Sequence, residues 1–267
     1  MNGAFSMYLI DIHTHIYPDE IAQKATDSIR TFYQLGGGGK DGTERMLLNR
    51  GAQAGISRFV VLPVAIRPDR VQGINDFICQ RVRHNDAFVG FGTVHAAMES
   101  PEAEAERIRR LGLRGIKMHP DSQRFAIDDP RLFPMYDAIA GKLPVILHMG
   151  DHRYDYSHPL KLRRVLDLFP KLQVIAAHFG GYGMYETAFE LLRDKDCIFD
   201  VSSSLMFMED GVAEKYINAY GPERMAFGTD YPLWDPVAET ERFFRLKLTD
   251  EQFEQIGHKT AERFLGL

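Results

Sequence analysis

Two histidines separated by a single residue, in the segment Asp11-Ile12-His13-Thr14-His15, have the type and spacing of metal ligands. Alternate side chains of a β-strand face the same way. A strand here would therefore place Asp11, His13 and His15 on one side, with the two histidines about 6.6 Å apart at Cα. Two imidazoles at that separation can converge on one cation. The alternative is that both are polar residues at a strand end with ordinary hydrogen bonds.

The same feature recurs at three later points, where a short apolar run stops at a histidine or an aspartate. His148 ends PVILH, His178 ends VIAAH and Asp230 ends MAFGTD. A glycine or a Tyr-Pro pair follows each of them within two residues. In a barrel of parallel strands all carboxyl ends open on one face, so residues far apart in sequence can meet there. The pattern predicts that these side chains gather at one site.

Five further residues are candidates for binding a substrate. Lys117 and His119 end the run GIKMHP on one face of a strand. For Lys117 the alternatives are a salt-bridged core residue, a contact for a substrate anion, and a carbamylated ligand of two metals; a non-carbamylated role is favoured. His119 either lines the pocket or shapes the following turn. Arg67 and Arg153 are candidates for binding a substrate carboxylate, with solvent exposure as the alternative. Tyr231 is a candidate for stacking on a ring, and its alternative is packing at the rim of the barrel.

Short β-branched apolar runs alternate with longer amphipathic ones along the whole chain. The short runs predict strands at Tyr8–His13, Arg58–Val64, Phe88–Val94, Gly115–Met118, Val145–His148, Val174–His178, Ile198–Val201 and Met225–Thr229. The amphipathic segments predict helices at Thr43–Ala54, Val71–Arg83, Pro101–Leu111, Leu132–Ala140, Pro159–Phe169, Met184–Arg193, Gly211–Tyr220 and Val237–Leu246. A last helix is predicted at Asp250–Phe264, because Thr249 and Gln252 form a capping-box pattern.

Eight strand–helix repeats in a chain of this length predict an α/β fold, a distorted TIM (β/α)8 barrel formed as a single domain by residues 1–267. An open doubly wound sheet is the alternative, but it usually carries a glycine-rich turn where this chain has His-Thr-His. The longest irregular stretch, residues 16–42, contains Gly36–Gly39 and predicts a flexible loop. Such a loop is either a lid over the barrel mouth or an uninvolved surface segment.

The overall composition excludes some classes of function. The 267 residues carry a net charge of −5 and no basic stripe, so neither nucleic acid nor a membrane is a predicted partner. No run approaches the roughly 18 apolar residues that span a bilayer, and no signal peptide is evident, so a cytoplasmic location is predicted. Cys79 and Cys197 lie in apolar stretches and are predicted to be buried free thiols.

In their order and intervals, the motifs DIHTH, GIKMHP, LHMGD, AHFGG and FGTDYP resemble those of the metal-dependent amidohydrolase superfamily. The resemblance is to the branch that includes aminocarboxymuconate semialdehyde decarboxylase. It implies that one divalent ion, usually zinc with manganese as the alternative, is bound by His13, His15, His148 and Asp230. It makes His178 a catalytic base, a polarising residue or a ligand of a second ion. It also implies a homodimer.

Three imidazoles and one carboxylate leave a coordination position open for water, which favours hydrolysis. The hypothesis is a metal-dependent hydrolase whose metal-activated water attacks a C–O or C–N bond of a small, carboxylate-bearing substrate. His178 or Asp230 would transfer the proton. The first alternative is a metal-dependent non-oxidative decarboxylase of an aromatic or enoic acid, in which His178 handles the proton at the adjacent carbon. The second is a barrel that binds metal without catalysis.

Overall fold

The strands are short and lie side by side in sequence order. The computed structural model describes residues 8–36 and 41–267, and its strand pairs are parallel. The strands are β1 (Leu9–Thr14), β2 (Ile56–Val61), β3 (Phe88–Gly90), β4 (Gly92–Thr93), β5 (Ile116–Met118), β6 (Val145–Leu147), β7 (Val174–Ala176), β8 (Ile198–Asp200) and β9 (Met225–Ala226). Because only Phe91 separates β3 from β4, both belong to the one strand predicted there. The described residues therefore occupy the eight predicted strand positions.

Hydrogen bonds between the first and last strands close the barrel. The strands form two sheets, with the orders β1-β2-β3 and β4-β5-β6-β7-β8-β9. The backbone N–H of Ile12 donates to the Phe227 carbonyl at 3.0 Å, and that of His15 donates to the Tyr231 carbonyl at 2.8 Å. These bonds join β1 to the segment that follows β9. The predicted distorted α/β TIM barrel is therefore confirmed.

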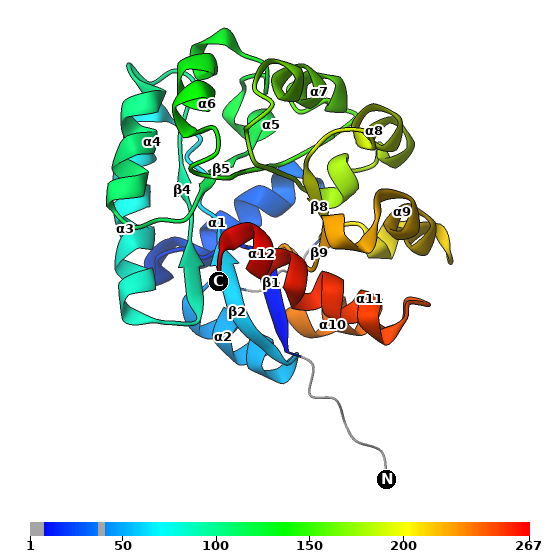
Figure 1. Cartoon of the computed structure of the whole chain (residues 1–267). Coiled ribbons are helices and arrows are strands. Elements are labelled where there is room, and N and C mark those ends of the chain that lie inside the picture. The colour runs from blue at the N-terminus through cyan, green and yellow to red at the C-terminus, as the bar shows by residue number, and fades with distance from the viewer. Residues whose placement is uncertain (1–7, 37–40) are drawn as a thin grey trace.

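Helices surround the strands on the outside of the barrel (Figure 1). They include α2 (Glu44–Gln53), α3 (Val71–His84), α4 (Pro101–Arg110), α6 (Phe133–Ile139), α7 (Pro159–Leu168), α8 (Tyr185–Leu192), α9 (Val212–Tyr220), α10 (Pro236–Phe244) and α11 (Asp250–Glu254). The helices α5 (Pro120–Gln123) and α12 (Thr260–Leu265) lie at the ends of the barrel. The predicted helices agree with these ranges to within a few residues. A π-helical turn at Gln255–Lys259 joins α11 to α12, and the predicted capping box of Thr249 and Gln252 is present.

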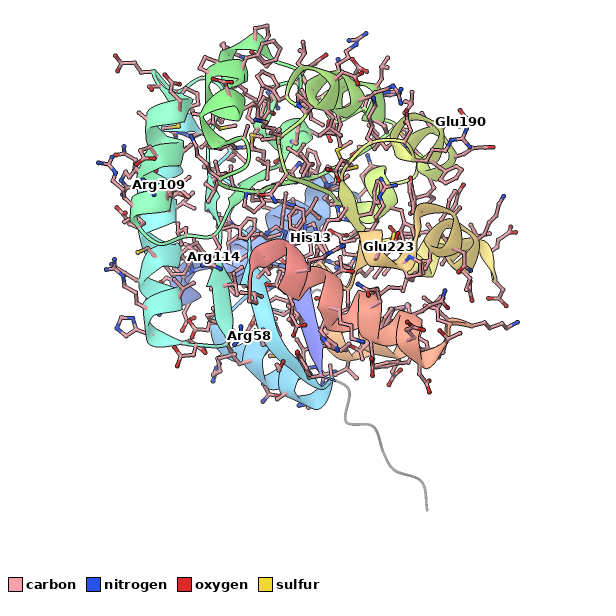
Figure 2. The ribbon with its side chains drawn as sticks, in the orientation of Figure 1. His13, Arg58, Arg109, Arg114, Glu190 and Glu223 are labelled. Atoms are coloured by element: carbon pink, nitrogen blue, oxygen red, sulfur yellow. The ribbon has the colours of Figure 1, made fainter. Side chains whose placement is uncertain are left out.

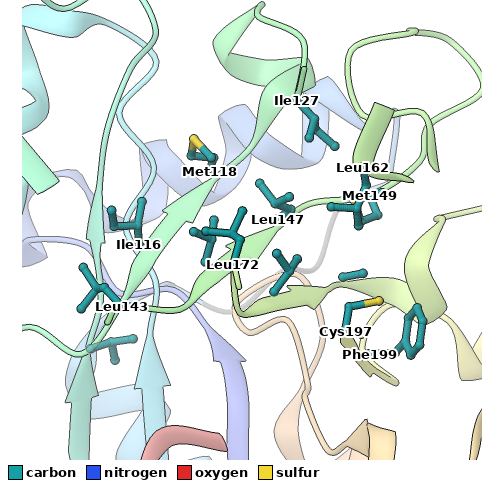
Figure 3. Packing of buried hydrophobic residues seen from close by; sticks show 14 of the residues in the cluster. Ile116, Met118, Ile127, Leu143, Leu147, Met149, Leu162, Leu172, Cys197 and Phe199 are labelled. Atoms are coloured by element: carbon teal, nitrogen blue, oxygen red, sulfur yellow. The ribbon is translucent and has the colours of Figure 1, made fainter. Parts of the chain in front are cut away.

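The core has an inner and an outer layer, which alternate along each strand. Ile146 belongs to the inner cluster, inside the ring of strands, whereas its neighbours Val145 and Leu147 belong to the outer cluster under the helices. Figure 3 shows part of the outer layer, with Ile116 and Met118 on β5 and Leu147 on β6. Residues of opposite parity on a strand thus face opposite sides of the barrel wall.

This alternation directs two polar residues to the inside of the barrel. Lys117 lies between the outer-layer residues Ile116 and Met118 and therefore points inward. His148 follows the inner-layer residue Ile146 by two positions and points the same way. The local strand pattern alone is enough to position both side chains.

The helix α12 covers the end of the barrel opposite the carboxyl ends of the strands. Its residues Ala261 and Leu265 pack into the inner cluster. In Figure 1 α12 lies over the middle of the ring of strands, with α1 (Asp19–Phe32) behind it. One end of the barrel is therefore sealed by apolar side chains, and only the other end can admit a ligand.

The prediction of a flexible loop over residues 16–42 is wrong for most of that stretch, which forms α1. An acidic residue in the first turn, Asp19, suits the amino-terminal end of a helix dipole. The helix is amphipathic, and Ala25, Ile29 and Phe32 lie on its inner face. The glycine run that suggested a loop follows the helix and does not bear on residues 19–32. Of the glycine run Gly36–Gly39, on which that prediction rested, residues 37–39 lie outside the described residues.

Two further findings concern membranes and the cysteines. No helix within the described ranges has the length and the apolar character needed to cross a bilayer. Cys79 and Cys197 are both buried and free, which confirms the prediction of free thiols. Burial raises the pKa of the Cys197 thiol to about 12, so this sulfur stays protonated and unreactive near neutral pH.

Candidate metal centre and cavity

A cavity of about 430 Å³ opens at the carboxyl ends of the strands. Its lining includes the predicted ligands and proton-transfer residues together with two predicted substrate contacts: His13, His15, Lys117, His119, His148, His178 and Asp230. The helix α1 supplies a further wall through Ile29, Phe32 and Tyr33. Figure 2 shows His13 near the middle of the ring of strands, whereas Arg109 and Glu190 lie on outer helices.

His13, His15 and Asp230 form one set of metal-competent side chains. The Oδ1 oxygen of Asp230 lies 3.3 Å from Nε2 of His15 and 3.7 Å from Nε2 of His13. The other ring nitrogens have partners behind the site: Nδ1 of His13 lies 2.9 Å from Asp200, and Nδ1 of His15 lies 2.6 Å from the Leu62 carbonyl oxygen. On both rings Nε2 is therefore the nitrogen directed at the cavity, where it can bind a cation beside Asp230.

His148 and His178 lie beside this set and contact each other. Nδ1 of His148 is 3.0 Å from Nε2 of His178, and Nε2 of His148 is 3.1 Å from the Gly150 carbonyl oxygen. Ligand atoms within 4.8 Å of one another form three groups: His13–His15–Asp230, His13–His178–Asp200 and His119–Asp121–His148. The structure thus brings His148 into the cavity but groups its ligand atom with His119 rather than with Asp230. The second group is the one that contains His178.

Burial determines the protonation states of these groups. Loss of hydration lowers the pKa of His13 to about 4 and the pKa of His148 well below its usual value. Burial alone would raise the pKa of Asp230, but the nearby His13 and a hydrogen bond from His15 hold that pKa well below its usual value. Neutral imidazoles beside an ionised carboxylate are a donor set that zinc and manganese accept. The residues present therefore fit a divalent metal.

Lys117 places a buried ammonium at the inner end of the cavity. Its Nζ lies 2.9 Å from Nε2 of His13, and burial lowers its pKa to about 8. Its side chain forms no ion pair within residues 8–36 and 41–267, so the core salt bridge considered from the sequence is not observed. An unpaired buried cation in a cavity is suited to an anionic ligand.

Asp200, the last residue of β8, is not among the residues predicted from the sequence. Its carboxylate is fully buried. It lies 2.9 Å from Nδ1 of His13 and accepts hydrogen bonds from the backbone N–H groups of His178 and Ser202, each at 3.0 Å. A carboxylate at Nδ1 fixes both the orientation and the tautomer of a ligand histidine. The available signal was the apolar run Cys197-Ile198-Phe199, which ends at an aspartate as other runs end at His148 and Asp230.

The prediction that Asp11 would face the same side as His13 and His15 is wrong. Asp11 lies outside the cavity lining and accepts hydrogen bonds from the backbone N–H and the hydroxyl of Thr229, at 3.0 and 2.5 Å. Strict alternation fails because the pairing of β1 with β2 shifts register between Asp11 and Thr14. Asp11 instead ties β1 to the segment that follows β9.

Three of the predicted substrate-binding residues also lie outside the cavity lining. Arg67 is exposed on a turn after β2 and pairs with Asp69 through two hydrogen bonds, at 2.9 and 2.8 Å. Tyr231 is fully buried, and its hydroxyl donates to the Thr43 carbonyl at 2.9 Å. Arg153 contacts the carboxyl end of α1 instead of the cavity. These positions give the predicted substrate contacts of Arg67, Arg153 and Tyr231 no support.

His178, Ser203 and Asp230 share an unusual backbone conformation. Their φ angles are 60°, 51° and 59°, in the left-handed region that residues other than glycine seldom adopt. Each such residue costs about 1–2 kcal/mol, so surrounding contacts must maintain it. Ser203 donates a hydrogen bond to Asp230 and accepts one from the indole N–H of Trp234 at 2.8 Å. Strain of this kind at two predicted catalytic residues indicates a functional site.

The sequence model of the family described as Amidohydrolase matches residues 10–267, nearly the whole chain. The chain belongs to the amidohydrolase family. Membership confirms the resemblance found in the motifs and agrees with the parallel barrel and with the clustered His and Asp side chains. Enzymes built on a TIM barrel have their active sites at the carboxyl ends of the strands, which is where the cavity lies in this chain.

Similar proteins include decarboxylases. A 2-amino-3-carboxymuconate-6-semialdehyde decarboxylase of Dictyostelium discoideum is 26% identical over 239 residues; the match covers 74% of this chain but only 64% of that protein. An uncharacterised TIM-barrel protein of Bordetella bronchiseptica has a TM-score of 0.80 at 22% identity, covering 97% of this chain and 98% of the other. A 5-carboxyvanillate decarboxylase of Novosphingobium aromaticivorans, complexed with manganese and 4-hydroxy-3-methoxy-5-nitrobenzoic acid, has a TM-score of 0.76 at 16% identity, with 100% and 98% coverage.

Proposed function

We propose that this amidohydrolase-family chain is a metal-dependent decarboxylase that removes CO2 from a small aromatic or enoic acid without oxidation. Hydrolysis, the leading hypothesis from the sequence, takes second place because the relatives with a stated activity are decarboxylases. The observation that carries the proposal is the cavity, which has a polar inner end and apolar walls.

The lining of this cavity suits a planar acid. Its volume of about 430 Å³ lies within the range of small-molecule sites. Phe32 and Leu233 offer apolar surface to a flat hydrocarbon body, and the ring of Tyr33 adds an aromatic face. Lys117 offers a positive charge at the inner end, where a carboxylate would lie. An acid with a flat, apolar body matches both parts of the cavity.

The residues proposed to hold the divalent ion, manganese or zinc, are His13, His15, His148 and Asp230. When bound, the ion supplies positive charge that orients the substrate carboxylate. Lys117 lies close enough to His13 to contact the same carboxylate from a second direction. These contacts hold the substrate with the carbon next to its carboxylate beside His178.

His178 is the residue proposed to deliver a proton. Its Nδ1 donates to the Ser202 carbonyl oxygen at 3.0 Å, so a second proton would be carried by Nε2, which lies 3.0 Å from Nδ1 of His148. In the doubly protonated form of His178, the Nε2 proton adds to the carbon that bears the carboxylate, and the ring becomes neutral. The bond between this carbon and the carboxylate carbon then breaks, its electron pair stays on the substrate, and CO2 leaves. His178 regains a proton from solvent, so atoms and charge balance.

The test is an assay on protein loaded with Mn²⁺ or Zn²⁺ and supplied with hydroxybenzoates and 2-enoic acids. We expect release of CO2, and in D2O we expect one deuterium on the carbon that lost the carboxylate. In water enriched in ¹⁸O the organic product should carry no label. Cleavage of esters, lactones or amides with ¹⁸O uptake and no CO2 would contradict the proposal and favour hydrolysis.

Replacement of the proton donor provides a second test. His178→Asn should lower kcat by about 10²–10⁴-fold while metal content stays unchanged, because asparagine cannot relay a proton. His158→Asn is the matched control: His158 caps α7 by accepting from the Leu160 N–H at 3.1 Å, and asparagine caps helices equally well. Unchanged kcat in His178→Asn would remove His178 from the mechanism.

A further inference from the structure

Tyr33 reaches the cavity from the end of α1. It is the C-cap of this helix, and its backbone N–H donates to the Ile29 carbonyl at 3.1 Å. The guanidinium of Arg153 lies 5.5 Å from the centre of the Tyr33 ring and donates a hydrogen bond to the Phe32 carbonyl at 2.5 Å. These contacts hold the Tyr33 side chain at a defined position in the cavity lining.

The hydroxyl of Tyr33 is hydrogen-bonded to His119, and the geometry fixes the direction of this bond. The hydroxyl oxygen lies 2.6 Å from Nε2 of His119. On the other side of the ring, the backbone N–H of Ser122 donates to Nδ1 of His119 at 3.3 Å. A nitrogen that accepts from an N–H carries no hydrogen, so the hydrogen of this imidazole is on Nε2. Nε2–H therefore donates to the Tyr33 oxygen, and the hydroxyl hydrogen points elsewhere.

The remaining neighbours of this hydroxyl are poor acceptors among the described residues. The ring nitrogens of His148 lie 3.4 and 3.3 Å from the hydroxyl oxygen, beyond the roughly 2.5–3.0 Å usual for a hydroxyl donor. One of them, Nε2, is directed at the Gly150 carbonyl oxygen at 3.1 Å. The Tyr33 hydroxyl thus presents a directed hydrogen at the cavity.

We propose that Tyr33 donates a hydrogen bond to a carboxylate oxygen of the bound substrate, and that His119 is a positioning residue that fixes this direction. The inference rests on the proposed function for the acidic substrate, but it concerns binding and not turnover. The hydroxyl oxygen already accepts from His119, which polarises its O–H and strengthens the bond it donates. Lys117 lines the cavity next to His13, whereas Tyr33 lines it next to His148. The two donors would therefore approach a carboxylate from different sides.

The experiment measures benzoate binding to the manganese-loaded protein by isothermal titration calorimetry. Tyr33→Phe keeps the ring and removes the donor, so Kd should rise about tenfold or more, as expected for a lost hydrogen bond to a charged acceptor. Tyr154→Phe is the matched control, because Tyr154 stacks on Phe32 from outside the cavity lining and its loss should leave Kd unchanged. A Tyr33→Phe affinity within about twofold of wild type, or no benzoate binding by the wild-type protein, would overturn the proposal.

His119 is tested by its own pair of variants. His119→Leu removes the donor to Tyr33 and should reproduce the loss of benzoate affinity, whereas His119→Gln keeps a side-chain N–H and should restore most of it. Equal benzoate affinities of His119→Leu and His119→Gln would overturn the positioning role of His119, because a residue that only supports the fold does not need a side-chain N–H. Metal content is measured in each variant. If CO2 release is never observed while Tyr33→Phe still weakens benzoate binding, the decarboxylase proposal fails and this inference stands.

Discussion

The imidazole of His13 depends on a carboxylate behind it for the direction of its lone pair. Its Nδ1 lies 2.9 Å from Asp200, and its Nε2 faces Asp230 across 3.7 Å. The pKa of Asp200 is held well below its usual value, because His13 and hydrogen bonds outweigh the effect of burial. An ionised carboxylate keeps the hydrogen of His13 on Nδ1, so the lone pair of Nε2 points at the cavity.

This arrangement predicts the effect of Asp200→Asn. The amide nitrogen of asparagine would donate to Nδ1 of His13, and the ring hydrogen would move to Nε2, where it blocks metal binding. We expect metal affinity to fall about 10–100-fold, as for other lost partners of ligand histidines. The measurement is a competition titration of the metal against a chelator of known affinity.

Asp196→Asn serves as the control for this change, because Asp196 is an exposed aspartate just before β8. It should bind metal as the wild type does. If Asp200→Asn also keeps wild-type metal affinity, His13 is not held in the way described.

Individual site residues differ in how far they could be predicted. His148 and Asp230 each follow a short apolar run, and this local sequence pattern is enough to predict them as site residues. Asp200 lies within a stretch predicted as strand up to Val201, and its partners come from β1 and from the segment after β7. Such a role depends on contacts between distant strands, which local periodicity does not contain.

Among the elements, α1 has the largest effect on the cavity, since it forms a wall of it without being part of a strand–helix repeat. Two loops hold it: Arg153, after β6, donates to the Phe32 carbonyl, and Arg30 of α1 donates to the Leu233 carbonyl after β9 at 3.2 Å. The repeats themselves could be predicted because each buries a continuous apolar face. The helix α1 carries Ile29 and Phe32 on its inner face, but it is an extra helix between β1 and α2, and the adjoining glycine run suggested a loop for the whole stretch.

Because Arg153 holds the carboxyl end of α1, we predict that Arg153→Ala loosens this helix. The variant loses the hydrogen bond to Phe32 and the cation–π contacts with the rings of Phe32 and Tyr33. Amide hydrogen exchange within α1 should become about tenfold faster, with a raised KM and an unchanged metal content. Arg164→Ala, which removes only an exposed ion pair with Asp128, should leave exchange in α1 as it is. Equal exchange in both variants would show that Arg153 does not hold the helix.

For the whole molecule, the barrel is open at one end and sealed at the other. Leu265 of α12 is only 6% exposed, packs with the inner cluster and does not line the cavity. The stability of the barrel and the chemistry of its mouth should therefore respond to different substitutions.

Leu265→Ala should lower the free energy of unfolding by about 2–5 kcal/mol, because it leaves a cavity beneath the inner core. Leu168→Ala is the matched control, since Leu168 is 59% exposed and its truncation should change stability by less than about 0.5 kcal/mol. Urea unfolding of metal-free protein measures both. Similar losses in the two variants would mean that α12 does not seal the barrel.

The hydrogen bonds between β1 and the segment after β9, which form the closing seam of the barrel, also join the two parts of the proposed metal site. His13 and His15 stand on one side of that seam and Asp230 on the other. The set His13, His15 and Asp230 is therefore complete only after β1 has paired with this segment. An ion held by these three residues would therefore stabilise the closed barrel and not a partly folded chain.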